Sequence, residues 1–286
     1  MNAPPRFKMR NTLIQHRVSL GAATPSCRTP RTCQSSTTLE RPASRHLALA
    51  NAGSTAPVSA PSNLVLQSLK AAQAVAFDVD STFCEDESID ELAAFLGVGA
   101  QVAALTAQAM GGSVDFKTAL TQRLAVMQPS RAAVAKFLIE HPHRISPGIP
   151  ELLTLLRQQG KEVFLVSGGF RQIIHPLAQH LDIPLDNVFA NNLLFQEDGS
   201  YAGFDTNEFT CRSGGKPAAL RHIQETWGLR QIVMVGDGAT DLEARLEGAA
   251  SLFIGYGGVV MRPNIAAKAD WYITSIQQFI DALEQA

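Results

Sequence analysis

Apolar runs recur along the chain, and each is followed by a segment with helical periodicity. The runs do not alternate with polar residues, which is typical of strands that are buried on both faces. We therefore expect strands at 74–77, 162–166, 231–235, 252–254 and 271–273, with helices at 149–159, 172–181, 217–227 and 242–245. This alternation predicts an α/β fold built on a doubly wound parallel sheet.

One stretch departs from the alternation because it shows only helical patterns. The expected helices are 88–96, 98–110, 116–127 and 130–140, and Pro142 and Pro147 follow them. We expect 84–144 to form a small helical cap inserted after the first strand, which leaves 61–83 and 145–286 as the α/β core. Such a cap would cover the carboxyl ends of the strands, where parallel sheets bind their ligands.

A second departure is a pair of apolar runs, 188–195 and 201–204, on either side of Glu197 to Ser200. The Asp-Gly pair at the centre of that stretch is a strong turn signal. The two runs therefore predict an antiparallel hairpin.

Charge is distributed unevenly along the chain. Residues 1–60 contain eight Lys or Arg and one acid, Glu40, a balance of +7, whereas the whole chain has 24 basic and 26 acidic residues. Subtraction leaves 16 basic and 25 acidic residues in 61–286, a balance of −9. The leader also holds 14 Ser or Thr and six Pro without a sustained apolar period. It predicts a disordered plastid transit peptide, with the mitochondrion as the alternative address and a plain basic tail as the simpler interpretation.

Composition excludes several classes of protein. A chain that is 45% hydrophobic can bury a core, so a wholly disordered protein is excluded. No apolar run approaches the roughly 20 residues of a membrane span, and the acidic body argues against a nucleic-acid partner. Cys84 and Cys211 have no metal-ligand spacing, so we expect two free thiols.

Polar motifs stand where two of the predicted strands end. Asp78 and Asp80 follow the first strand, and carboxylates at this spacing can meet in one turn, although such pairs are also common in ordinary loops. Ser167, Gly168 and Gly169 end the second strand and open a helix. A hydroxyl and unhindered N–H groups at a helix N-terminus form an anion site, and an ordinary helix cap is the simpler alternative.

The third predicted strand is followed by Asp237, Thr240 and Asp241 at the start of a helix. Their carboxylates suit a hard divalent cation such as Mg²⁺, and a simple capping turn is the alternative. Lys216 precedes Pro217, which we expect at the first helical position, so this lysine is unusually placed for a solvated charge. Each motif is weakly informative alone, and the information lies in their combination.

In this order the motifs resemble those of the haloacid dehalogenase superfamily of phosphoryl-transfer enzymes and, within it, the phosphoserine phosphatase family. The resemblance rests on residues 78–82, 87, 89–93, 110–112, 116–117, 123–124, 128–130, 166–170, 236–241 and 254–258. It implies a Mg²⁺-dependent enzyme of the plastid-targeted plant or algal type. Such an enzyme hydrolyses O-phospho-L-serine to L-serine and phosphate, the last step of the phosphorylated pathway of serine biosynthesis.

The resemblance assigns the catalytic roles to the strand ends. It implies that Asp78 is the nucleophile that forms an aspartyl-phosphate, and that Asp80 is the general acid and then the general base. Mg²⁺ would be bound by Asp78, the backbone carbonyl of Asp80, and Asp237. Asp241 would orient Lys216. The implied residues for the phosphoryl group are Ser167, Gly168, Gly169 and Lys216.

The resemblance assigns substrate selection to the cap. Glu87 would receive the substrate's ammonium, and Arg123 would grip its carboxylate in a bidentate pair. Without the other motifs, an acid at a helix start and a solvated arginine would be the simpler interpretations. Thr240 stands where many family members carry Asn, so its contact with substrate stays open, and Met110 and Gly111 would shape the pocket.

Two other functions share part of this pattern. A phosphatase of the same superfamily for another small metabolite, such as phosphothreonine or phosphohomoserine, would differ only in the cap. A phospho-receiver signalling module also uses an Asp and Mg²⁺ at parallel strand ends, but it needs neither the second acid nor the cap. The family suggests a monomer or a homodimer, and the sequence does not choose between them.

Overall fold

The computed structural model describes residues 60–110 and 114–286, without the side chain of Met110. The predicted transit peptide, up to residue 59, lies outside the described residues. The same holds for Gly111 and for the side chain of Met110. The roles assigned to these residues therefore stay predictions.

A six-stranded sheet forms the centre of the described chain, and every strand pairing within it is parallel. The strand order is β3-β2-β1-β6-β7-β8, which places the first strand between the second and the sixth. The bounds are β1 Ala74–Phe77, β2 Glu162–Phe170, β3 Val188–Asn191, β6 Ile232–Gly236, β7 Leu252–Tyr256 and β8 Trp271–Ile273. The predicted α/β fold with a parallel sheet is confirmed.

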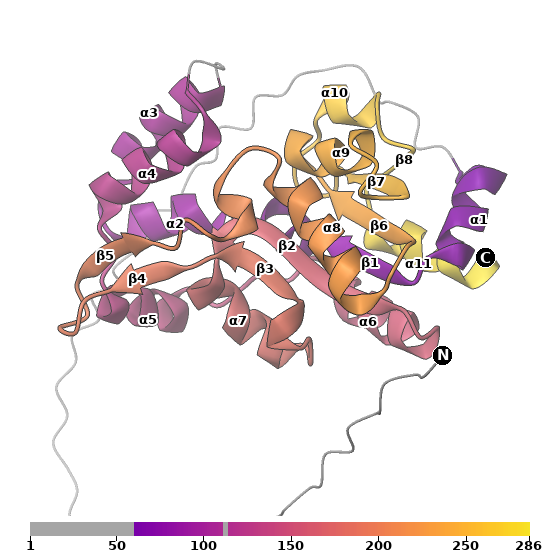
Figure 1. The fold of residues 1–286 in the computed structure, drawn as a ribbon, viewed down its shortest axis with the longest axis horizontal. Coiled ribbons are helices and arrows are strands. Elements are labelled where there is room, and N and C mark those ends of the chain that lie inside the picture. Colours follow the sequence, from indigo (N-terminus) through magenta and orange to yellow (C-terminus); the bar gives the residue numbers. More distant parts are fainter. Residues whose placement is uncertain (1–59, 111–113) are drawn as a thin grey trace, which may run out of the picture. The chain divides into compact units, whose positions relative to one another are not determined.

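Helices pack on both faces of this sheet (Figure 1). All four residues of β1 are buried, because Val75 and Phe77 point to one helical layer and Ala74 and Ala76 to the other. The first layer consists of α1 Asn63–Ala71, α6 Ile149–Gln158, α7 Arg171–His180 and α11 Ile276–Gln285. The second layer consists of α8 Gly215–Trp227, α9 Ala239–Leu246 and α10 Pro263–Ala266. Burial on both faces explains why the strands are continuous apolar runs.

Four helices lie between β1 and β2 in the chain, and we call them the helical insertion. They are α2 Ser88–Phe95, α3 Gly99–Met110, α4 Phe116–Met127 and α5 Arg131–Glu140. Asp115 and Ser130 cap α4 and α5, each accepting an N–H bond of 3.1 Å from the third residue of its helix. Leu92, Leu120 and Phe137 belong to a separate apolar cluster that holds the insertion together.

The predicted hairpin is correct in its second half only. β4 Leu193–Phe195 pairs antiparallel with β5 Tyr201–Phe204, but β3 Val188–Asn191 joins the main sheet parallel to β2. The reason is burial, since all four residues of β3 are enclosed. Leu193 belongs to the apolar cluster of the helical insertion, so the hairpin packs against that layer.

Two connectors join the helical insertion to the sheet, and they run antiparallel to each other. Cys84 bridges to Ile145, the Glu85 N–H donates to the Arg144 carbonyl at 2.7 Å, and the Ser146 N–H donates to the Phe83 carbonyl at 3.0 Å. These bonds fix the base of the insertion beside the end of β1.

Cys84 and Cys211 are buried free thiols, as predicted. Within residues 60–110 and 114–286, no helix has the length and apolar character that crossing a membrane requires.

Candidate active site

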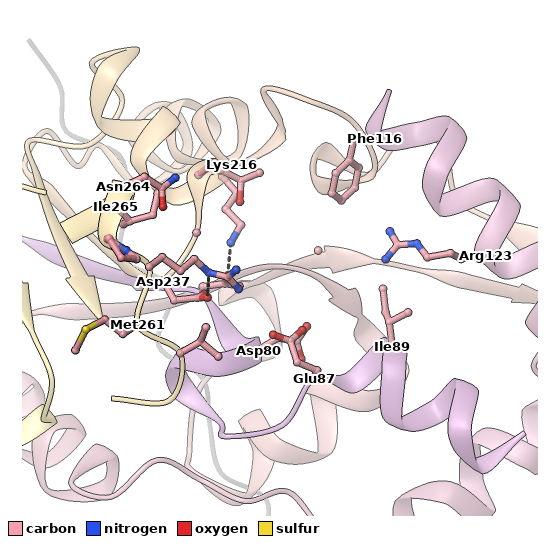
Figure 2. A pocket seen from close by; sticks show the side chains of 18 residues that line it. Asp80, Glu87, Ile89, Phe116, Arg123, Lys216, Asp237, Met261, Asn264 and Ile265 are labelled. Carbon is pink, nitrogen blue, oxygen red and sulfur yellow. Dashed lines mark hydrogen bonds and ion pairs between the residues drawn. The ribbon is translucent and has the colours of Figure 1, made fainter. Parts of the chain in front are cut away.

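The carboxyl ends of β1, β2 and β6 meet at one edge of the sheet, because these strands are parallel neighbours. A cavity of about 810 Å³ opens there, between the sheet edge and the helical insertion. Figure 2 shows Lys216 and Asp237 on the side of the sheet and Arg123 on the side of the insertion. The predicted site residues that line the cavity are Asp78, Asp80, Glu87, Arg123, Gly168, Lys216, Asp237 and Thr240.

Asp78 is the first residue after β1, and three bonds fix it. Its N–H donates to the Val235 carbonyl of β6 at 2.9 Å, which continues the sheet by one residue. One carboxylate oxygen accepts the Val79 N–H at 2.7 Å, and the other lies 2.7 Å from the Lys216 ammonium. A carboxylate held in this way faces the cavity in one orientation, as a nucleophile must.

Lys216 is buried, and its ammonium lies between two carboxylates. Nζ is 2.7 Å from Asp78 and 2.6 Å from Asp241. Burial by itself lowers the pKa of Lys216, but the two carboxylates raise it above its ordinary value. The side chain therefore carries a fixed positive charge beside Asp78.

The start of α8 differs from the prediction. Pro217 is the third helical residue and not the first, since α8 begins at Gly215. Gly214 adopts a left-handed φ of 70°, and a Cβ on Gly215 would lie 2.3 Å from the Phe209 carbonyl oxygen. The two glycines let the chain turn tightly enough to bury Lys216 in the first helical turn.

Asp241 is fully buried behind Lys216, and both of its oxygens are engaged. Oδ1 accepts from Lys216, and Oδ2 accepts the Gly238 N–H at 3.0 Å. A Cβ on Gly236 would lie 2.2 Å from the Asp241 carboxyl carbon, so the strand end must be glycine for Asp241 to fit. The predicted contact between Asp241 and Lys216 is present.

Three carboxylates could hold a cation, since oxygens of Asp78, Asp237 and Asp241 lie within 4.8 Å of one another. Each of the three accepts bonds within the protein, but only Asp78 and Asp237 also line the cavity. Burial and the neighbouring Asp78 raise the pKa of Asp237, which a bound cation would reverse. Oxygen donors alone fit a hard divalent ion.

Asp80 lies in a π-type turn, Val79–Phe83, and its Oδ1 accepts the Ser88 N–H at 3.0 Å. Burial, followed by the charges of Asp78 and Glu87, raises the pKa of Asp80 to about 7. Near neutral pH this carboxyl can both hold and release a proton. A general acid that later acts as a base requires that property.

The Ser167 to Gly169 segment is placed differently from the prediction. β2 continues through it to Phe170 with an irregular register, and α7 begins only at Arg171. Ser167 therefore does not cap the helix. Its Oγ accepts the Gly169 N–H at 3.0 Å, within the irregular part of the strand, and Gly168 lies on the cavity wall.

Glu87 and Arg123 bring opposite charges to the insertion side of the cavity. Glu87 precedes α2, is exposed, and accepts the Ser81 hydroxyl at 2.7 Å. Arg123 lies on α4, is half-buried, and donates to the Ala119 carbonyl of its own helix at 3.3 Å. Thr240 lies in the first turn of α9 at the sheet edge.

Comparison with known proteins gives consistent results. The family model of haloacid dehalogenase-like hydrolases matches residues 72–247. The chain belongs to the haloacid dehalogenase-like hydrolases. Over 224 residues it is 51% identical to the chloroplastic phosphoserine phosphatase of Arabidopsis thaliana. The matched region covers 78% of this chain and 76% of that protein.

Two solved structures show where this hydrolase fold recurs. A substrate-bound phosphoserine phosphatase complex has a TM-score of 0.63 and 26% identity, over 73% of this chain and 97% of that one. The structure of DsGPDH from Dunaliella salina has a TM-score of 0.70 and 38% identity. The match covers 78% of this chain but only 38% of DsGPDH, so the hydrolase fold is there one part of a longer protein.

The sequence argument missed one charged residue of this candidate site. Arg262 lines the cavity, and its Nε lies 2.8 Å from Asp237. It belongs to the loop that follows β7, and β7 is the neighbour of β6. The rule that parallel strand ends share one edge could have directed attention to this loop, because it follows the Gly-rich segment 254–258.

Proposed function

We propose that this hydrolase is a Mg²⁺-dependent phosphoserine phosphatase that converts O-phospho-L-serine and water to L-serine and phosphate. The observation that carries the proposal is that Glu87 and Arg123 line the same cavity as Asp78, Asp80 and Lys216. Phosphoserine has an ammonium, a carboxylate and a phosphate. The cavity offers each a group of opposite charge, namely Glu87, Arg123 and Lys216 in that order. The 51% identity to the Arabidopsis thaliana enzyme supports the same substrate.

In the first step, Asp78 attacks phosphorus and the bond between phosphorus and the seryl oxygen breaks. Asp80 gives its proton to that oxygen, so the leaving oxygen becomes the neutral hydroxyl group of L-serine. The pKa of about 7 for Asp80 supports this role, because the group is substantially protonated near neutrality. Lys216, 2.7 Å from Asp78, would balance the negative charge that gathers on the phosphoryl oxygens.

In the second step, the aspartyl-phosphate on Asp78 is hydrolysed. Asp80, now ionised, takes a proton from a water molecule as its oxygen attacks phosphorus. The bond to Asp78 breaks, phosphate leaves, and both carboxyl groups return to their starting states. Ser167, Gly168 and Gly169 would offer the phosphoryl group hydrogen bonds throughout.

We assign the cation to Asp78, Asp237 and the backbone carbonyl of Asp80. When bound, Mg²⁺ would draw together the negative charges of the phosphate and the carboxylates. Asp241 would stay with Lys216, in keeping with its burial behind that lysine.

Residues 84–144 would act as the cap that selects the substrate. Glu87 would bind the ammonium and Arg123 the carboxylate. The assigned roles of Met110, Gly111 and Thr240 are to shape the pocket around the serine part.

A hydrolysis panel tests the substrate. The purified full-length chain should hydrolyse O-phospho-L-serine with a kcat/KM at least about tenfold above that for O-phospho-L-threonine, phosphohomoserine or a sugar phosphate. A smaller preference would favour another phosphatase of the same superfamily. An aspartyl-phosphate that forms and persists without turnover would favour a receiver module.

We also propose that residues 1–60 address the enzyme to the plastid stroma for serine biosynthesis, with the mitochondrion as the alternative. The basic, acid-poor leader and the chloroplastic relative support this address. A fluorescent protein fused to residues 1–60 should accumulate in plastids. Diffuse fluorescence in the cytosol would contradict any organelle address.

A further inference from the structure

Ser81 has an uncommon backbone conformation immediately after Asp80. Its φ is 53°, in the left-handed region that glycine favours, and its side chain is fully buried. A non-glycine residue there is strained, and such strain persists where surrounding bonds hold it in place.

The bonds that hold Ser81 lead to the segment that enters the helical insertion. Its N–H donates to the Asp86 carbonyl at 3.1 Å, and its hydroxyl donates to the Glu87 carboxylate at 2.7 Å. The N–H of Ser88, the residue after Glu87, donates to the Asp80 carboxylate at 3.0 Å. Three successive residues, the last two of the first connector and the first of α2, are therefore bonded to Asp80 or Ser81.

The same segment is fixed from its other side by Arg144. The buried Asp86 carboxylate accepts the Arg144 backbone N–H at 2.7 Å and its Nε at 2.5 Å. The backbone on both sides of Glu87 is thus held. The orientation of the Glu87 carboxylate depends in addition on the Ser81 hydroxyl.

This hydroxyl acts against repulsion. Partial burial disfavours the negative charge of Glu87, and without a cation the carboxylates of Asp237 and Asp78 repel it as well. The residue itself is exposed to water. Without a donor at Ser81, the carboxylate would be expected to turn away from the cavity.

We propose that Ser81 is a specificity-positioning residue, whose hydroxyl holds the Glu87 carboxylate where it receives the substrate's ammonium. This inference rests on the proposed function. The residue that orients Glu87 would then lie next to Asp80, the proposed proton donor, in the turn Val79–Phe83.

The test compares two esters in Ser81→Ala. One is O-phospho-L-serine, and the other is 3-phosphooxypropanoate, which keeps the phosphate and carboxylate but lacks the ammonium. Loss of a hydrogen bond to a charged group should lower kcat/KM for phosphoserine by about tenfold, mainly through KM. For 3-phosphooxypropanoate, kcat/KM should change by less than about twofold.

Two further variants separate the hydroxyl from strain and from stability. Ser81→Gly also lacks the hydroxyl but relieves the left-handed backbone, so it should lose the same discrimination as Ser81→Ala. Ser130→Ala removes a hydroxyl that caps α5 and should lower the melting temperature without changing the ratio between the esters.

Each outcome decides the matter. Equal losses for both esters in Ser81→Ala, or an unchanged ratio, would overturn the role of Ser81 while leaving the proposed function intact. A wild-type enzyme without preference between the two esters would overturn the proposed function and this inference with it.

Discussion

The two sides of the cavity hold their charged side chains in different ways. On the sheet side, Lys216, Asp237 and Asp241 are nearly or completely buried, and each is paired with a charge from another element. On the insertion side, Glu87 is exposed, and Arg123 is half-buried with a bond inside its own helix. Under the proposed function, the groups for phosphoryl chemistry are thus preorganised by buried ion pairs, and the charges for substrate recognition are less constrained.

This difference predicts how variants should behave. Changes on the sheet side should abolish turnover for every substrate and often destabilise the fold. Changes on the insertion side should alter the choice of substrate while the fold stays intact. The predictions below run from the largest expected effect to the smallest.

Asp78→Asn should lower kcat for all phosphate esters by at least about a thousandfold, because an amide cannot form the aspartyl-phosphate. Steady-state kinetics with O-phospho-L-serine measure this. Asp186→Asn, a change at an exposed aspartate outside the cavity, is the matched control and should keep its activity. Appreciable turnover by Asp78→Asn would contradict the covalent scheme.

Removal of divalent cations by a chelator should lower kcat by at least about a hundredfold, and added Mg²⁺ should restore it. Mg²⁺ should also raise the melting temperature of the wild type, since it binds the folded carboxylates. In Asp237→Asn that rise should be weaker. If the melting temperature of the wild type did not change with Mg²⁺, this would argue against a cation site at Asp78 and Asp237.

Lys216→Met should lower kcat by about a hundred- to a thousandfold through loss of the fixed positive charge. It should also lower the free energy of unfolding by about 3–5 kcal/mol, because Asp241 is left buried without its partner. Adding Asp241→Asn should recover part of that stability, measured by denaturant unfolding, but none of the activity. Full recovery of activity would mean that Lys216 is only structural.

Arg123→Ala should raise KM for O-phospho-L-serine by about ten- to a hundredfold, because a charge-assisted pair with the substrate carboxylate is lost. For O-phosphoethanolamine, which lacks the carboxylate, KM should change by less than about twofold. The melting temperature should stay close to that of the wild type. Equal effects on both esters would mean that Arg123 does not bind the carboxylate.

Arg144→Gln should have the smallest effect. Its side chain is 60% exposed, and its backbone N–H would still donate to Asp86. We expect the melting temperature to fall by about 1–3 °C and kcat/KM for phosphoserine to change by less than about threefold. A much larger loss of activity with an unchanged melting temperature would show that the side-chain ion pair also positions Glu87.

Local patterns were sufficient for several elements that are defined by their own residues, although α1 and α11 were not predicted. β1 and β8 have the predicted bounds, since a strand buried on both faces is an uninterrupted apolar run. The helices of the insertion begin and end within two residues of the prediction, because their caps and breaks are encoded locally. The order of motifs at the strand ends also follows from the chain alone.

Local patterns failed where a distant partner decides the outcome. Residues 188–191 resemble one arm of a hairpin, yet they pair with β2, more than 20 residues earlier in the chain. The start of α8 depends on how closely Gly215 approaches Phe209. The ion pair between Arg262 and Asp237 depends on β6 and β7 being neighbours.

The sequence by itself determined the α/β alternation, the inserted helices, and which residue types stand at each strand end. The tertiary structure decided which charges meet: Asp241 with Lys216, Arg262 with Asp237, and Ser81 with Glu87. Secondary structure follows from short-range periodicity, which a sequence displays directly. The pairing of buried charges depends on strand order and on the depth of packing, and both are properties of the folded chain.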